Sequence, residues 1–280
     1  MTLSQARAAE LTKLCNDFRI DVLTTLHDVQ TGHAGGSLSV CEILVTLYME
    51  CANISPENQH APDRDRIILS KGHGAPMLYR CLCEKGFFPK EELATLRQPG
   101  SRLQGHPCAA KTPGVELSTG PLGLGLSAGS GMACANRLLG NSAFTFVVLG
   151  DGELNEGTVW EAAMSAAKFR CERLIAIVDW NKVQLDGMAD DVMPMPHMSA
   201  RWASFGWNVF ECDGHSVSAL YENIEAAKAM ANGRPSVILA NTVKGKGVSF
   251  MEGTNKYHGK AISDDEYARA MKELGGVENG

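Results

Sequence analysis

A carboxylate and an amide stand thirty positions apart in this sequence, and each follows an apolar run. Asp151 lies in the segment 150–152 (GDG), directly after the run 144–149, and Asn181 comes shortly after the run 174–178. Apolar runs separated by a helical pattern predict parallel strands, whose carboxyl ends form the ligand-binding edge of an open α/β sheet. Oxygen donors of these types suit a small hard cation such as Mg²⁺, and the main-chain carbonyl of Val183 would add a third. The spacing therefore predicts a magnesium site that also holds a diphosphate.

Glycines on both sides of Asp151 fit the same interpretation. Gly150 and Gly152 allow the backbone to approach a phosphate closely, and the helix expected next would point its N-terminus toward it. The Gly150-Asp151-Gly152 turn is common by itself, so the interpretation depends on the strand before it and on Asn181 after it.

His33, His73, His106 and His258, which are four of the eight histidines, each stand beside a glycine. Imidazole both donates and accepts hydrogen bonds near neutral pH, which suits a polyhydroxylated sugar phosphate. Zinc is the competing interpretation, but none of these histidines has a second ligand at the usual spacing. The four loops are therefore expected to bind substrate.

A glycine-rich segment, Gly120-Pro121-Leu122-Gly123, could pass for a dinucleotide-binding loop. No strand precedes it, however, and the full dinucleotide fingerprint is not formed. We expect it to open a helix over 121–140 with proline in the first turn, and its amides or carbonyls could touch a cofactor.

The apolar periodicity predicts a helical N-terminal third, followed by strands that alternate with helices. Helices are expected near 11–29, 38–51, 155–169, 198–205, 217–231 and 263–274, and strands near 66–69, 144–149, 173–178, 207–210 and 236–241. Ser263 and Glu266 predict a capping box on the last helix. This pattern indicates the α/β class: a doubly wound, mostly parallel sheet flanked by helices, with 1–280 forming a single domain.

Composition excludes several classes of function. The net charge is −6 without a block of lysine and arginine, so no nucleic-acid partner is expected. No apolar stretch reaches the roughly 18–20 residues of a membrane span, and no secretory signal is recognised, so we expect a cytoplasmic protein that does not insert into membranes. Nine cysteines without a CxxC pair fit reduced thiols in that compartment.

Seven segments along the chain carry the motifs of one family, in that family's order. They are 31–39 (TGHAGGSLS), 63–73 (DRDRIILSKGH), 105–107 (GHP), 114–123 (GVELSTGPLG), 150–157 (GDGELNEG), 179–182 (DWNK) and 244–248 (KGKGV). Together they resemble transketolase, a thiamine diphosphate enzyme, and the resemblance covers nearly the whole chain. It implies transfer of a two-carbon ketol unit from a ketose phosphate to an aldose phosphate.

The resemblance also implies roles for individual residues. Metal ligands would be Asp151, Asn181 and the carbonyl of Val183, with Mg²⁺ as the ion and Ca²⁺ or Mn²⁺ able to substitute. Cofactor contacts would come from His73, Gly120, Pro121, Leu122, Gly152 and Asn181. Catalytic residues in the substrate channel would be His33, His106 and His258. Acidic positions between two cofactor sites would be Glu156 and Glu161, for which an ordinary exposed helix face is the alternative.

The resemblance is to the diphosphate-binding domain of that family and not to its pyrimidine-binding domain. The second domain supplies the glutamate that activates the cofactor, so we expect this chain to be inactive alone. A separate C-terminal transketolase subunit would complete each site, in an α2β2 heterotetramer.

Three alternatives remain open from the sequence. One is 1-deoxyxylulose-phosphate synthase, which is a fused chain and departs from this sequence at the Gly-His loops. An α subunit of a 2-oxo acid dehydrogenase also has a split site, but such subunits are not expected to carry the three early Gly-His loops. A non-catalytic scaffold subunit would keep the fold, and the intact Asp151, Asn181 and four histidines argue against it.

Overall fold

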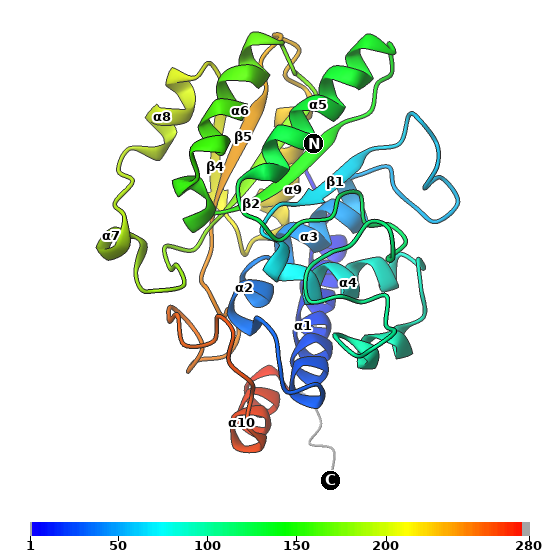
Figure 1. Cartoon of the computed structure of the whole chain (residues 1–280), viewed down its shortest axis with the longest axis vertical. Helices are drawn as coiled ribbons and strands as arrows, with labels where there is room; N and C mark the ends of the chain where they lie inside the picture. The colour runs from blue at the N-terminus through cyan, green and yellow to red at the C-terminus, as the bar shows by residue number, and fades with distance from the viewer. Residues whose placement is uncertain (1, 276–280) are drawn as a thin grey trace.

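A five-stranded parallel sheet forms the centre of the protein, with helices on both faces (Figure 1). This computed structural model describes residues 2–275. The strands are β1 (Arg66–Leu69), β2 (Thr145–Gly150), β3 (Leu174–Trp180), β4 (Asn208–Asp213) and β5 (Ser236–Asn241). Their order in the sheet is β1-β2-β3-β5-β4, and every neighbouring pair is parallel. The expected doubly wound α/β fold is confirmed.

Alternate residues of the central strands face opposite sides of the sheet, and both sides are buried. Phe146 and Val148 of β2 belong to one apolar core, whereas Val147 and Leu149 belong to the other. This burial on both faces explains why the strands read as continuous apolar runs in the sequence. Each fully buried side chain of this size contributes about 1.5–3 kcal/mol to folding.

The helices divide between the two faces of the sheet. Those that supply the first core are α1 (Gln5–Asp28), α2 (Ala34–Ser39), α3 (Cys41–Thr46), α4 (Ala75–Glu84), α9 (Val217–Lys228) and α10 (Asp264–Leu274). Those that supply the second core are α5 (Leu124–Leu138), α6 (Gly157–Lys168) and α8 (Met198–Ser204). Shorter helical turns are η1 (Leu47–Cys51), η2 (Gly72–Gly74), η3 (Lys90–Thr95), η4 (Gly152–Asn155) and α7 (Ala189–Val192). The capping box of Ser263 and Glu266 is confirmed at the start of α10.

Register places the two loops of interest side by side. Gly150 at the end of β2 pairs with Asp179 near the end of β3. Because the strands are parallel, the residues after these positions, Asp151 and Asn181, leave the sheet at the same edge.

Two helix predictions were wrong in detail. The helix expected at 121–140 begins only at Leu124, because Gly123 adopts a left-handed φ of 87° that no helix can include. Pro121 therefore lies in a loop before the helix. The helix expected at 38–51 is broken at Val40, whose ψ of 1° separates α2 from α3.

No helix within residues 2–275 combines the length and the apolar character that a bilayer span requires.

Candidate active site

The loops after β2 and β3 line a cavity of about 170 Å³ at the carboxyl edge of the sheet. Asp151, Asn181 and Val183, the three expected metal ligands, all lie on its wall. The other sequence-predicted residues on the wall are Gly152, His73, Leu122 and His258. The structure thus gathers residues from five separate segments of the chain around one space.

Asp151 is a buried carboxylate, only 3% exposed. One oxygen accepts a hydrogen bond from the Gly152 amide at 2.7 Å, and the other accepts from the Lys182 amide. Burial raises the pKa of Asp151 to about 6, and the nearby Asp179 carboxylate adds to the rise. A divalent cation placed beside this carboxylate would favour its charged form.

The donor set fits Mg²⁺ and a diphosphate. Carboxylate, amide and main-chain carbonyl oxygens are hard ligands, and three of them leave room for phosphate oxygens in an octahedron. The Val183 carbonyl already accepts from Lys244 Nζ at 2.9 Å, but a carbonyl oxygen has a second lone pair. A Cβ on Gly152 would lie 3.1 Å from the Gln184 side chain, so glycine keeps this side of the cavity open.

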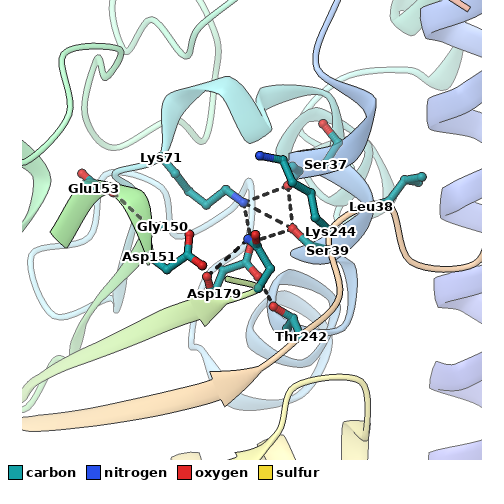
Figure 2. A network of polar contacts seen from close by, with 12 residues as sticks. Ser37, Leu38, Ser39, Lys71, Gly150, Asp151, Glu153, Asp179, Thr242 and Lys244 are labelled. Atoms are coloured by element: carbon teal, nitrogen blue, oxygen red, sulfur yellow. Dashed lines mark hydrogen bonds and ion pairs between the residues drawn. The ribbon is translucent and has the colours of Figure 1, made fainter. Parts of the chain in front are cut away.

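A buried ion pair joins Lys71, which lies on the cavity wall, to Asp179 (Figure 2). Lys71 Nζ contacts Asp179 Oδ2 and also donates to the Gly36 carbonyl at 2.9 Å. Asp179 further accepts from the Ser39 hydroxyl at 2.6 Å and from the Thr242 hydroxyl. Burial alone would raise the pKa of Asp179, but Lys71 and the two hydroxyls hold it below its usual value. The network ties α2 and the ends of β1, β3 and β5 together next to the three expected metal ligands.

Lys244 is a second buried cation, 3% exposed, on the cavity wall. Its ammonium donates to the carbonyls of Val183 and Gln184, at 2.9 and 3.3 Å, and to His258 Nδ1 at 3.1 Å. Burial and the charge of Lys71 lower the pKa of Lys244 to about 8. The lysine therefore offers positive charge to an anionic group that enters the cavity.

His33, His73, His106 and His258 come together from four separate segments of the chain. The ring centroid of His33 lies 5.6, 6.0 and 5.3 Å from those of His73, His106 and His258, respectively. Burial, followed by the charge of Arg97 for His33 and of Lys244 for His258, lowers the pKa of each of these two histidines to about 4. Burial also lowers the pKa of His73 and His106. Neutral imidazoles that both donate and accept hydrogen bonds therefore line this part of the site.

The remaining predicted residues lie at the edge of the site or outside it. Gly120 lies beside the ring of His106, because a Cβ added to Gly120 would be 3.5 Å from His106 Cγ. The adjacent Pro121 is exposed. Glu156 and Glu161 are exposed and are not part of the cavity wall.

Sequence reasoning assigned no role to Lys71, Asp179, Lys244 or Arg97. Lys71, Asp179 and Lys244 lie within the segments that resemble transketolase, and the position of the two lysines directly before a glycine was the signal that could have identified them. Arg97 had no such signal, because its neighbours are unremarkable in the sequence and its contacts to His33 span 64 positions.

Comparison with known proteins agrees with this geometry. Residues 11–279 match the family described as "Transketolase, thiamine diphosphate binding domain". The 6-deoxy-6-sulfo-D-fructose transketolase subunit SqwG of a Clostridium species is 43% identical over 95% of this chain and 96% of its own length. An apulose-4-phosphate transketolase subunit of Actinobacillus succinogenes is also 43% identical, over 87% of each chain.

Solved structures lead to the same family. Transketolase from Leishmania mexicana superposes with a TM-score of 0.91 at 29% identity, covering 100% of this chain and 42% of the other. The Campylobacter jejuni transketolase gives a TM-score of 0.89 at 29% identity. This chain spans about two fifths of the length of these transketolases. It belongs to the family of the transketolase thiamine diphosphate binding domain.

Proposed function

We propose that this chain is the N-terminal subunit of a split, thiamine diphosphate-dependent transketolase that transfers a two-carbon ketol unit from a ketose phosphate to an aldose phosphate. The observation that carries the proposal is the convergence of three oxygen donors and four neutral histidines around one site. End-to-end similarity to a relative named as a transketolase subunit supports the split arrangement.

Asp151, Asn181 and the Val183 carbonyl would hold Mg²⁺, and Ca²⁺ or Mn²⁺ would be accepted in its place because all three are hard cations. Gly152, Asn181 and His73 would contact the diphosphate. The backbone of 120–122 would lie along the cofactor. When bound, thiamine diphosphate supplies the electron sink for the two-carbon fragment.

The chain's own contribution is to orient substrate and to move protons. His33, His106 and His258 would bind sugar hydroxyls and exchange protons with them. Their lowered pKa values keep the rings neutral at pH 7, so each ring can donate through one nitrogen and accept through the other.

The proposal includes a partner. A C-terminal subunit with a pyrimidine-binding domain would complete each site, and two such pairs would form an α2β2 heterotetramer. Glu156 and Glu161, which are exposed here, would lie between the two cofactor sites of that assembly. We also infer that residues 1–280 act as one domain in the cytoplasm; the nine free cysteines fit a reducing compartment.

The α subunit of a 2-oxo acid dehydrogenase and a non-catalytic scaffold are less well supported. The relatives described above are named as transketolases, and the four-histidine cluster provides the hydrogen-bonding groups that a sugar needs.

Calorimetry tests the cofactor assignment directly. The purified chain is titrated with thiamine diphosphate in the presence and in the absence of Mg²⁺, and binding that depends on the metal is expected. A non-catalytic scaffold subunit would bind neither thiamine diphosphate nor Mg²⁺. Ketol transfer is then assayed with and without the C-terminal subunit, and full activity of the chain alone would contradict the split arrangement.

A further inference from the structure

The guanidinium of Arg97 lies against the histidine cluster without a counter-charge. Its two terminal nitrogens contact Thr31 Oγ1 at 3.2 Å and His33 Nδ1 at 3.4 Å. Within residues 2–275 no carboxylate lies within ion-pair distance of it, although the neighbouring Arg102 is paired with Glu92. A partly buried arginine that contacts a histidine instead of an acid requires an explanation.

The backbone around Arg97 holds the side chain in this place. Arg97 has a left-handed φ of 61°, a conformation that is uncommon for residues other than glycine, and its amide donates to the Leu103 carbonyl at 2.9 Å. A Cβ on Gly105 would lie 2.9 Å from Arg97 Cζ, so the absence of a side chain there makes room for the guanidinium. Such strained positions cluster at functional sites.

Arginine can only donate hydrogen bonds, and this property decides the state of His33. The Nδ1 atom that faces Arg97 must be the acceptor, so the ring proton of neutral His33 must sit on Nε2. Within the described chain Nε2 has no hydrogen-bond partner, which leaves it free to donate to a ligand. The other groups that face His33 are the rings of His73, His106 and His258 and the ammonium groups of Lys71 and Lys244.

We propose that Arg97 is a positioning residue that donates to His33 Nδ1 and so fixes His33 as the neutral Nε2–H tautomer, which donates to a hydroxyl of the bound sugar. The inference rests on the proposed function, because it gives His33 a sugar to contact. The charge of Arg97 also lowers the pKa of His33 and of His106, after burial, and this keeps both rings from becoming imidazolium.

The test uses NMR of the full chain labelled with ¹⁵N-histidine, since this signal reports tautomer and titration without turnover. The wild-type chain is expected to show His33 as the Nε2–H tautomer, titrating near pH 4. In Arg97→Met the tautomers should mix, and the pKa should rise toward 6.5 without reaching it because burial remains. Arg97→Lys keeps a donor-only cation and should restore much of the wild-type signal.

Two further variants separate this role from a general structural one. Arg102→Met removes a positive charge from the same segment and should leave the signals of His33 unchanged. Gly105→Ala leaves Arg97 and His33 chemically intact but displaces the guanidinium, so it should cause the same change in the His33 signals as Arg97→Met. It therefore keeps the test decisive if Arg97→Met folds poorly.

Activity of the assembled enzyme gives the second readout. In Arg97→Met, kcat/KM should fall about tenfold, consistent with the loss of one hydrogen bond, and the acid limb of its pH profile should move to higher pH. Unchanged His33 signals in both Arg97→Met and Gly105→Ala would overturn the inference. So would a rise in KM for phosphorylated substrates with an unmoved pH limb, because Arg97 would then contact the substrate anion itself. Lack of activity in the wild-type assembly would refute the proposed function, while the NMR signals would still decide the tautomer.

Discussion

Replacement of Asp179 by asparagine tests the buried ion pair that it forms with Lys71. The side chains of Lys71 and Asp179 are 1% and 0% exposed, so neither charge is solvated by water. The substitution leaves the Lys71 ammonium with neutral partners alone, such as the Gly36 carbonyl. Removing one partner of a buried pair costs about 3–5 kcal/mol, because an uncompensated charge stays buried. We therefore expect Asp179→Asn to lower the free energy of unfolding by about 3 kcal/mol.

That loss would be a large share of the total stability, which is typically about 5–15 kcal/mol. Equilibrium unfolding in urea at pH 7 measures it, and an unchanged m-value shows that the native state is still compact. Asp17→Asn is the matched control: Asp17 pairs with Lys13 on the surface, where the two side chains are 43% and 78% exposed. An exposed helical pair of this kind contributes only about 0.3–0.5 kcal/mol.

The double variant isolates the pair itself. In Lys71→Met with Asp179→Asn the buried charge is gone, and the asparagine keeps the hydroxyls of Ser39 and Thr242 as partners. Its cost should therefore be smaller than the sum of the single costs by up to about 3 kcal/mol. Additive costs, or an Asp179→Asn cost no larger than that of Asp17→Asn, would refute the reasoning about burial.

Three further outcomes follow from the geometry. Asp151→Ala should weaken the Mg²⁺-dependent affinity for thiamine diphosphate about 100-fold or more, since loss of even an outer partner costs about 10–100-fold; calorimetry measures it, and an unchanged affinity would contradict the metal assignment. The pKa of His33 in the folded chain is lowered to about 4, so between about pH 6.5 and 4 the unfolded chain binds a proton that the folded chain does not, and the free energy of unfolding should fall as the pH drops. Over that interval His33→Asn should lose about 1–3 kcal/mol less free energy of unfolding than the wild type, as measured by unfolding at a series of acid pH values. In α5, Gly129→Ala should destabilise by about 1–3 kcal/mol, because its Cβ would lie 2.4 Å from a β2 side chain, whereas Gly131→Ala has nothing within 4 Å and should stabilise by up to about 1 kcal/mol; equal shifts in Tm would refute this contrast.

Local patterns in the sequence determined the class of the fold and the main elements. β2, β3 and β5 are buried on both faces, so their sequences are continuous apolar runs, and such runs predict the strands of a parallel sheet. Ser263 and Glu266 predicted their capping box because such a cap depends on residues only three positions apart. The start of α5 was misplaced because Gly123 takes a left-handed conformation where Thr158 and Glu156, which are distant in sequence, approach too closely for any side chain.

The sequence also determined which residues have the right chemistry: the oxygens of Asp151 and Asn181, and the histidines that stand beside glycine. Parallel strands end at one edge of the sheet, so the neighbourhood of Asp151 and Asn181 followed from strand order and needed no knowledge of packing. Only the tertiary structure decided which partner each buried or half-buried cation finds: Asp179 for Lys71 across 108 positions, His258 for Lys244, and His33 for Arg97. A buried charge requires an opposite charge or a hydrogen-bond partner, and burial depends on how distant segments pack. No short segment of the chain therefore predicts these partners.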